Sequence, residues 1–422
     1  MPWATTTVNS TEVEATIPAA ELTAATQATI TVANGTSAIP GSNTLYFGVD
    51  PAPPAGTTIA VYPTGGNDLK WDANASKLYV SMPGIQGTQG DSIAVVDPLA
   101  RTVSQTAFVG SEPDRLAVSS DGSYLYLGLD GQNAMEQLTL PGLAVNHAWN
   151  LGADSFSGPY YALDIEAAPG APQTTAAILA YFDVSPSAAS VQIYDNGTAR
   201  GTGLSATFNA YEWLQWGGDD STLYAVDQSV PQSFFALSAG SSGATLSQDY
   251  NGILNGYSPT IHYDAGTGMV YTDAGQVINP TSGTVVASLG ASGIAVPDST
   301  LDRVFILGQT AAQAGTHNYT IESFDETKFT AVGSVAIDNV VGTPTALVRW
   351  GSDGLAFTTN VQSTPQPFAV GGGQLYVISG SSVTAALRLG GNQDSSAIVP
   401  VHRTWQGATA LRQRMGRTRT MP

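Results

Sequence analysis

A β-hairpin pattern that recurs about every 47 to 49 residues restricts this chain to very few folds. In the clearest copy, Pro113 to Asp130, apolar residues alternate with small or polar ones ahead of Asp121-Gly122. Asp-Gly can adopt the positive φ angles of a tight turn, and the run of aromatic and aliphatic residues that follows suits a second strand. This segment is therefore predicted to be a β-hairpin.

Seven copies of the hairpin occur along the chain, and each is followed by a second pair of strands. Four of the copies carry a tyrosine at the same position. The copies begin near Asp68, Pro113, Asp164, Trp213, Thr260, Ile294 and Leu347, and the matched tyrosines are Tyr79, Tyr126, Tyr224 and Tyr271. Several strands per unit at this period are typical of a β-propeller. We therefore predict an all-β fold, a seven-bladed propeller with four strands per blade.

The composition agrees with an all-β fold and excludes several kinds of function. The 422 residues include 46 glycines and 24 prolines, only 11% are charged, and there is no cysteine, which rules out disulfides, thiolate zinc sites and cysteine nucleophiles. The net charge of −19 argues against a nucleic-acid partner and suits cations or an exported protein. No apolar run of eighteen residues occurs, so no membrane span is expected.

The two ends of the chain differ from the repeat region. Residues 1–50 read as short strands, 51–56 as a proline-rich linker, 57–400 as the propeller and 401–422 as a basic, disordered tail. Ala15 to Leu22, Ala28 to Asn34 and Gly41 to Phe47 resemble the second half of a bacterial Ig-like repeat of the IPT/TIG kind. The chain is therefore expected to open with a partial Ig-like sandwich and to begin inside a domain.

The hairpins also resemble a group of bacterial propellers. Pro113 to Ser119, with Asp121-Gly122 and the Tyr124-Leu125-Tyr126 run, is similar to the YVTN-type and lactonase-like seven-bladed propellers. The resemblance covers roughly residues 57 to 400 and concerns the fold rather than a catalytic motif. It implies either surface proteins without a known activity or sugar-lactone hydrolases, some of which hold a divalent cation, often calcium, at the axial channel.

Four acidic residues stand at or just before the start of an innermost strand, where the loops face the mouth of the channel. They are Asp68, Asp114, Asp164 and Glu212. Carboxylates converging on one axis repel each other, and a hard cation with oxygen ligands, calcium before magnesium, would neutralise them. The alternative is that they lie in separate solvated loops or pair with Arg115 and Lys70.

Other candidates could move a proton or stabilise an oxyanion. Asp164, Glu166 or His262 would accept the proton of an attacking water, and Arg115 or a tyrosine of the pair Tyr160-Tyr161, chiefly Tyr161, would stabilise the oxyanion. A single inner-strand histidine is more often packed between blades, which is the competing interpretation of His262. A further set of aspartates is expected only to cap the first hairpin turn: Asp72, Asp121, Asp219, Asp264, Asp298 and Asp353.

Two functions remain after these exclusions, and a redox propeller ranks third. The first is a hydrolase that opens a small lactone, of the sugar or acyl homoserine class, at the axial channel with calcium as its cofactor. The second is a non-catalytic extracellular propeller that binds carbohydrate or protein at the bacterial surface. In both cases a monomer that acts outside the cell or on its surface is expected, although the chain opens with no signal peptide.

Overall fold

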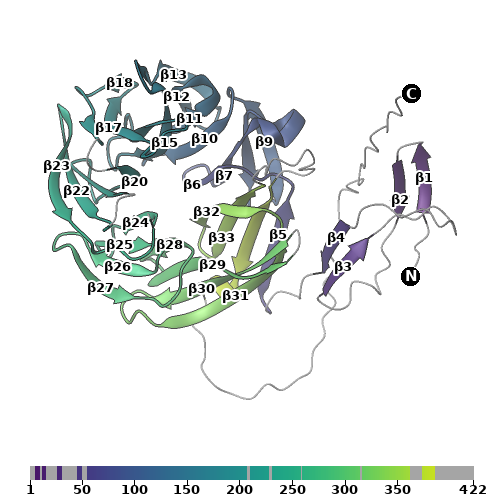
Figure 1. Ribbon diagram of the computed structural model, residues 1–422. Helices are drawn as coiled ribbons and strands as arrows, with labels where there is room; N and C mark the ends of the chain where they lie inside the picture. Colours follow the sequence, from purple (N-terminus) through teal and green to yellow (C-terminus); the bar gives the residue numbers. More distant parts are fainter. Residues whose placement is uncertain are drawn as a thin grey trace, which may run out of the picture. The chain divides into compact units, whose positions relative to one another are not determined.

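The computed structural model describes residues 5–9, 12–15, 26–30, 45–49, 55–206, 210–227, 231–257, 259–313, 316–361 and 373–384. The chain divides into two compact units. One comprises Met1–Ala52 with Arg388–Pro422, and the other comprises Pro53–Leu387. The larger unit contains seven antiparallel sheets arranged as blades around a common axis (Figure 1).

Blades 1, 2, 4, 5 and 6 run outward from the axis in sequence order, and six of the seven sheets have four strands. Blade 1 consists of β6 (Asp68–Asp72), β7 (Lys77–Met82), β8 (Ser92–Asp97) and β9 (Thr102–Phe108). Blade 2 consists of β10 (Pro113–Val118), β11 (Tyr124–Leu129), β12 (Ala134–Thr139) and β13 (Ala144–Asn150). Blade 4 consists of β20 (Tyr211–Trp216), β21 (Thr222–Asp227), β22 (Phe234–Gly240) and β23 (Gly243–Tyr250). These blades confirm the predicted four-stranded unit.

The remaining blades follow the same plan. Blade 5 consists of β24 (Ile261–Asp264), β25 (Met269–Thr272), β26 (Gln276–Asn279) and β27 (Thr284–Ser288). Blade 6 consists of β28 (Ile294–Asp298), β29 (Arg303–Gln313), β30 (Thr316–Asp325) and β31 (Ala331–Val340). Blade 7 consists of β32 (Thr343–Trp350), β33 (Gly354–Asn360), β34 (Leu375–Gly380) and β5 (Thr57–Tyr62). The all-β, seven-bladed propeller is thereby confirmed.

Blade 7 closes the ring with a strand from the other end of the unit. Strand β5 pairs antiparallel with β34, with Tyr62 opposite Leu375 and Thr57 opposite Gly380. Closure leaves no unpaired sheet edge between the first and last blades. The structure confirms the predicted pairing of 57–61 with 375–378, whereas the further strand expected at 385–389 lies outside the described residues.

Blade 3 departs from the predicted four strands. It is a six-stranded sheet with a short added hairpin at its inner edge and two short strands on its outer side. Its strands are β14 (Ala153–Asp154), β15 (Gly158–Ala167), β16 (Thr174–Tyr181), β17 (Ala188–Asp195), β18 (Thr198–Ala199) and β19 (Leu204–Ser205). Strand β15 has ten residues and begins earlier than its counterparts, so blade 3 extends further at the face where the innermost strands begin.

The hydrophobic core consists of clusters formed where neighbouring blades pack together. Ile178 of blade 3, for example, lies in one buried cluster with Leu214 and Trp216 of blade 4. The four repeated tyrosines are all buried. Five of the six turn aspartates behave as predicted, because side-chain oxygens of Asp72, Asp121, Asp219, Asp264 and Asp298 accept backbone N–H groups two or three residues ahead. The capping role of Asp353 stays a prediction.

Outside the blades, the described residues form only short elements. Those in the larger unit are two 3₁₀ turns and one helix, η2 (Gly84–Gln89), η3 (Asp130–Gln132) and α1 (Ser381–Thr384). In the smaller unit β1 (Thr5–Asn9) pairs with β2 (Glu12–Ala15), and β3 (Thr26–Ile30) pairs with β4 (Leu45–Val49). These lie close to the four expected strands. No helix among the described residues has the length and apolarity required to cross a bilayer.

Candidate functional site at the axis of blades 1 to 3

Two of the predicted acids connect neighbouring blades. The Asp68 carboxylate accepts the backbone N–H of Leu116, on blade 2, at 2.9 Å, and Asp164 accepts that of Leu214, on blade 4, at 2.7 Å. The second oxygen of each carboxylate accepts the N–H of the next residue in its own strand. Because both side chains are buried and bonded in this way, their first role is to hold adjacent inner strands together.

Arg115 occupies the equivalent position on blade 2 and joins three blades. Its Nε donates to the Leu163 carbonyl at 3.1 Å, and its guanidinium lies 4.9 Å from the centre of the Trp213 ring. The Asp114 carboxylate is 3.9 Å from the same Nε. The stacked, paired guanidinium is therefore a fixed positive charge near the axis.

Seven charged side chains of blades 1 to 3 act on one another electrostatically, and we call them the axial cluster. Its members are Asp68, Lys70, Asp114, Arg115, Asp130, Asp164 and Glu166. Burial, with the fields of neighbouring carboxylates, raises the pKa of Glu166 and of Asp130 to about 8. Burial also raises the pKa values of Asp114 and Asp164, against the field of Arg115. At neutral pH the cluster therefore retains protons on some of its carboxyl groups.

The two cations of the axial cluster stay charged. Burial by itself would lower the pKa of Lys70, but the fields of Asp68, Glu166 and Asp164 outweigh it and raise that pKa. The fields of Asp114, Asp68 and Asp164 likewise outweigh burial and raise the pKa of Arg115. Lys70 lies 3.5 Å from an Asp68 oxygen. The predicted alternative, in which the acids pair with Arg115 and Lys70, thus describes part of the observed arrangement.

An aromatic pair lies beside the axial cluster at the start of β15. The Tyr161 and Phe182 rings stack with centroids 4.4 Å apart, and Phe182 remains 43% exposed. Behind them the Tyr160 and Tyr181 rings lie 5.2 Å apart. Burial and then the field of Asp130 raise the pKa of Tyr161, which places its phenol within reach of the cluster charges. An exposed apolar surface and polar groups therefore meet here.

His262 occupies a different part of the ring. It lies on β24 of blade 5, and its Nε2 is 2.8 Å from an Asp273 oxygen that also accepts the N–H of Ala295 on blade 6. The histidine thus belongs to a contact between blades 5 and 6, whereas the axial cluster comes from blades 1 to 3. This favours the packing interpretation of His262 over a role as the general base for that cluster.

The predicted metal ligands do not assemble into a recognisable cation centre. Glu212 lies on β20 of blade 4, while the oxygens of Asp68 and Asp164 are turned towards backbone N–H groups. In the part of the chain that the structure describes, no three histidine or acidic side chains are grouped so as to hold a metal ion. The four acids do not fit a calcium site in this arrangement, and calcium binding by the protein stays a prediction.

Sequence reasoning assigned Lys70 only to a counter-ion role and did not select Asp130. Both carried a signal in the sequence. Lys70 follows Asp68 by two residues, as Glu166 follows Asp164, and alternate residues of a strand share a face. Asp130 directly follows Leu129, which pairs with Pro113, so the register of the hairpin brings Asp130 towards Asp114.

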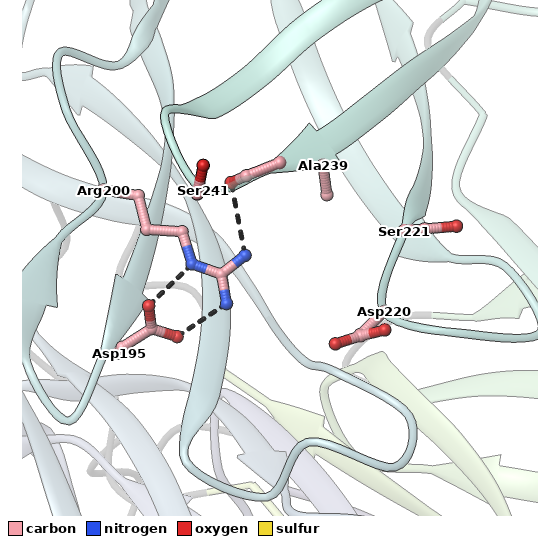
Figure 2. A pocket seen from close by; sticks show the side chains of 7 residues that line it. Asp195, Arg200, Asp220, Ser221, Ala239 and Ser241 are labelled. Carbon is pink, nitrogen blue, oxygen red and sulfur yellow. Dashed lines mark hydrogen bonds and ion pairs between the residues drawn. The ribbon is translucent and has the colours of Figure 1, made fainter.

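A cavity of about 370 Å³ lies away from the axis, between the outer strands of blades 3 and 4 (Figure 2). On one side Arg200 donates Nε and Nη2 to the two oxygens of Asp195, at 2.6 and 2.7 Å. Asp220 and Ser221 lie opposite. Because the Asp195 carboxylate already neutralises Arg200, this wall offers no unpaired positive charge to a ligand.

Comparison with known proteins shows the fold of the chain. No family model matches it, and no curated protein matches it. Among solved structures, the Swd1 β-propeller domain of Myceliophteria thermophila is 11% identical with a TM-score of 0.53, covering 75% of this chain and 96% of that one. The structure of U3-55K is also 11% identical with a TM-score of 0.53, covering 78% and 100%. The dihydro-heme d1 dehydrogenase NirN is 12% identical, covers 65% and 67%, and has a TM-score of 0.44. The likeness to the Swd1 domain and to U3-55K supports the propeller fold alone.

Proposed function

We propose that this propeller binds carbohydrate at the axial end of blades 2 and 3, on the surface of a bacterial cell and as a monomer. The observation that carries the proposal is the stacked Tyr161–Phe182 pair, half open to solvent and adjacent to Asp130, Asp114 and Arg115. Sugar rings pack on aromatic faces. Sugar hydroxyls donate hydrogen bonds to carboxylate oxygens and accept them from guanidinium N–H groups. A few directed polar groups beside an apolar surface are typical of small-ligand sites.

Accessibility of the polar groups supports the same proposal. The side chains of Asp114 and Arg115 each keep 23% of their area exposed, and that of Lys70 keeps 32%. A ligand resting on Phe182 could therefore exchange hydrogen bonds with these groups without unfolding the blades. Their relative positions are fixed by the inter-blade bonds of Asp68 and Asp164, which limits the ordering cost of binding.

Calorimetric titration of the purified protein with a panel of neutral, acidic and amino oligosaccharides tests the proposal. We expect binding by at least one class and a loss of at least tenfold in affinity for Phe182→Ala, because the exposed stacking face is removed. Phe108→Ala is the matched control, since Phe108 is a 76% exposed aromatic on β9, the outermost strand of blade 1. The proposal would be contradicted if no oligosaccharide of the panel gave a heat of binding, or if Phe182→Ala bound with the same affinity as the parent.

Lactone opening is the second candidate, and the raised pKa of Glu166 favours it. Glu166 would take a proton from water as the water oxygen adds to the ring carbonyl. The ring C–O bond would then break, and the departing alkoxide would take up the proton held by the Glu166 carboxyl group. Arg115 and Tyr161 would stabilise the oxyanion. Asp164 is less suited to take the proton, because backbone N–H groups already occupy both of its oxygens.

A pH-stat assay with sugar lactones and acyl homoserine lactones, with calcium or chelator, tests the second candidate. Because Glu166 must be deprotonated to act as a base, the rate is expected to rise through about pH 8 and to disappear in Glu166→Gln. A rate that is unchanged in Glu166→Gln excludes this mechanism. If no lactone is hydrolysed in the pH-stat assay and an oligosaccharide gives a heat of binding in the calorimetric titrations, carbohydrate binding remains as the function.

A further inference from the structure

Blade 3 carries an exposed aromatic side chain at the tip of its added inner hairpin, which none of the other described sheets has. Asp154 of β14 pairs with Gly158 of β15, and this pairing places Phe156 in the turn between the two strands. Phe156 is 97% exposed, more than any other large hydrophobic side chain in the described part of the chain. Its ring therefore contributes little to the packing of the blade.

Hydrogen bonds to one carboxylate stabilise this turn. An Asp154 oxygen accepts the backbone N–H groups of Phe156 and Ser157, both at 2.8 Å. The bonds from Ser157 and Phe156 lower the pKa of Asp154, so the carboxylate is charged at neutral pH. Gly158, which follows, has a φ of 91°, in the left-handed region that favours glycine. The Phe156 ring is therefore presented by a preorganised turn, which limits the ordering cost of binding a ligand.

The strand register brings Phe156 to the same end of blade 3 as Phe182. Tyr160 of β15 pairs with Tyr181 of β16, so the next residue of that strand, Phe182, comes about level with Pro159. The span from Pro159 back to Phe156 is at most ~10 Å of extended chain. Two exposed aromatic rings therefore stand at one end of one blade, at a separation that a short oligosaccharide can span.

The groups around Phe156 suit a ligand rich in hydroxyls better than a protein partner. Ser155 and Ser157 flank the ring, and their hydroxyls can both donate hydrogen bonds to a sugar and accept them from it. The exposed apolar side chains at this end of the blade include Phe156, Phe182 and Val184. Three such side chains fall well short of the roughly 800 Å² per partner that a stable protein interface buries. The net charge of −19 also opposes the association of two copies.

We propose that Phe156 is a second contact for the bound carbohydrate, so that blade 3 takes a short oligosaccharide chain rather than a single sugar. One ring of the chain would be the sugar that stacks on the Tyr161–Phe182 pair, so the second contact rests on the proposed function. A ring further along the same chain would pack on the open face of Phe156, and the serine hydroxyls of the turn would bond its edge. The added hairpin of blade 3 is then the element that selects for ligand length.

Titration calorimetry of the full-length protein with fragments of cellulose, chitosan and polygalacturonate, each from monosaccharide to hexasaccharide, tests this second contact. We expect the affinity to rise at least tenfold between the monosaccharide and the tetrasaccharide and then to level off, because the longer fragments contact both rings. Phe156→Ala should abolish that rise and leave the affinity for the monosaccharide unchanged, whereas Phe182→Ala should weaken binding at every length. Phe156→Tyr keeps an aromatic face and should bind like the parent, as should Phe108→Ala on blade 1.

The second contact and the proposed function can fail separately. An affinity that does not change with chain length, or a rise that persists in Phe156→Ala, overturns the second contact and leaves the axial carbohydrate site in place. Absence of binding in all three series removes both. A dimer of the parent that Phe156→Ala converts to a monomer in size-exclusion chromatography would assign the ring to a second copy and overturn the second contact. Thermal melts of Phe156→Ala and the parent should coincide, because the ring is exposed.

Discussion

The axial cluster and the pair of Glu326 and Tyr271 between blades 5 and 6 both contain acidic side chains at blade contacts, but these side chains have different neighbours. The axial cluster is partly exposed, whereas Glu326 and Tyr271 are buried. At the axis, Asp68 and Asp164 accept backbone N–H groups of the next blade, and Lys70 and Arg115 supply positive charge. Between blades 5 and 6, Glu326 lies instead beside the Tyr271 phenol, and no N–H group or cation bonds its carboxyl within the described residues. The comparison shows that a carboxylate connects blades in this propeller where the next blade presents a backbone N–H group to it.

The largest expected effect comes from removing one of the connectors. Asp164→Ala leaves the Leu214 N–H unpaired in a buried position and uncovers the charge of Arg115. We expect a loss of about 2–4 kcal/mol in the free energy of unfolding. Denaturant unfolding checks this against Asp249→Ala, which alters an exposed aspartate on β23. A loss no larger than in that control would show that Asp164 does not hold blades 3 and 4 together.

Tyr126 of blade 2 and Tyr271 of blade 5 occupy the same position of the repeat, so substituting each of them tests the comparison directly. Tyr126→Phe breaks two hydrogen bonds and orphans the Gln137 amide, so it should cost about 1–2 kcal/mol. Tyr271→Phe removes a hydroxyl that lies beside the Glu326 carboxyl rather than between a carbonyl and an amide, and it should cost less. Thermal melts of the two variants are compared with that of the parent. Equal losses would mean that the Tyr271 hydroxyl is bonded as strongly as that of Tyr126.

A smaller effect concerns the pH dependence of stability. Burial raises the pKa of Glu166 to about 8 in the folded protein from its usual value of 4.5, so between those values the folded state binds more protons than the unfolded state. The contribution of Glu166 to stability therefore falls as the pH rises from about 4.5 to 8. Glu166→Gln should flatten this decline and raise the melting temperature at pH 8 by about 2 °C. A parallel decline in parent and variant would contradict the assignment.

The smallest expected effect is at the N-terminus. Deleting residues 1–50 should leave the melting transition of the propeller within about 1 °C of the parent, because the ring closes through β5, which begins only at Thr57. Calorimetric scans of the two proteins test this. If the main transition disappears, the first fifty residues contribute to the propeller core.

The sequence by itself determined the propeller. Apolar alternation and turn residues such as Asp and Gly define each hairpin locally, and the recurrence of the hairpin defines the number of units, so all seven inner hairpins could be located in advance. The closing pair of β5 and β34 followed because a ring without it would leave two bare edges. The extra strands of blade 3 were not predictable in the same way, since strands of two residues carry no periodicity.

Only the tertiary structure decided what the acids do. The starts of the innermost strands are visible in the sequence, and they were the basis for choosing Asp68, Asp114, Asp164 and Glu212 as candidates, with Arg115 beside them. Whether a carboxylate there meets a backbone N–H, a cation or another acid depends on how one blade is rotated against the next, over about fifty residues of chain. Local pattern does not encode that rotation, because it results from side-chain packing between blades. For the same reason the sequence could not decide between the packing and the catalytic interpretation of His262, and the proximity of Glu326 to Tyr271 could be found only in three dimensions.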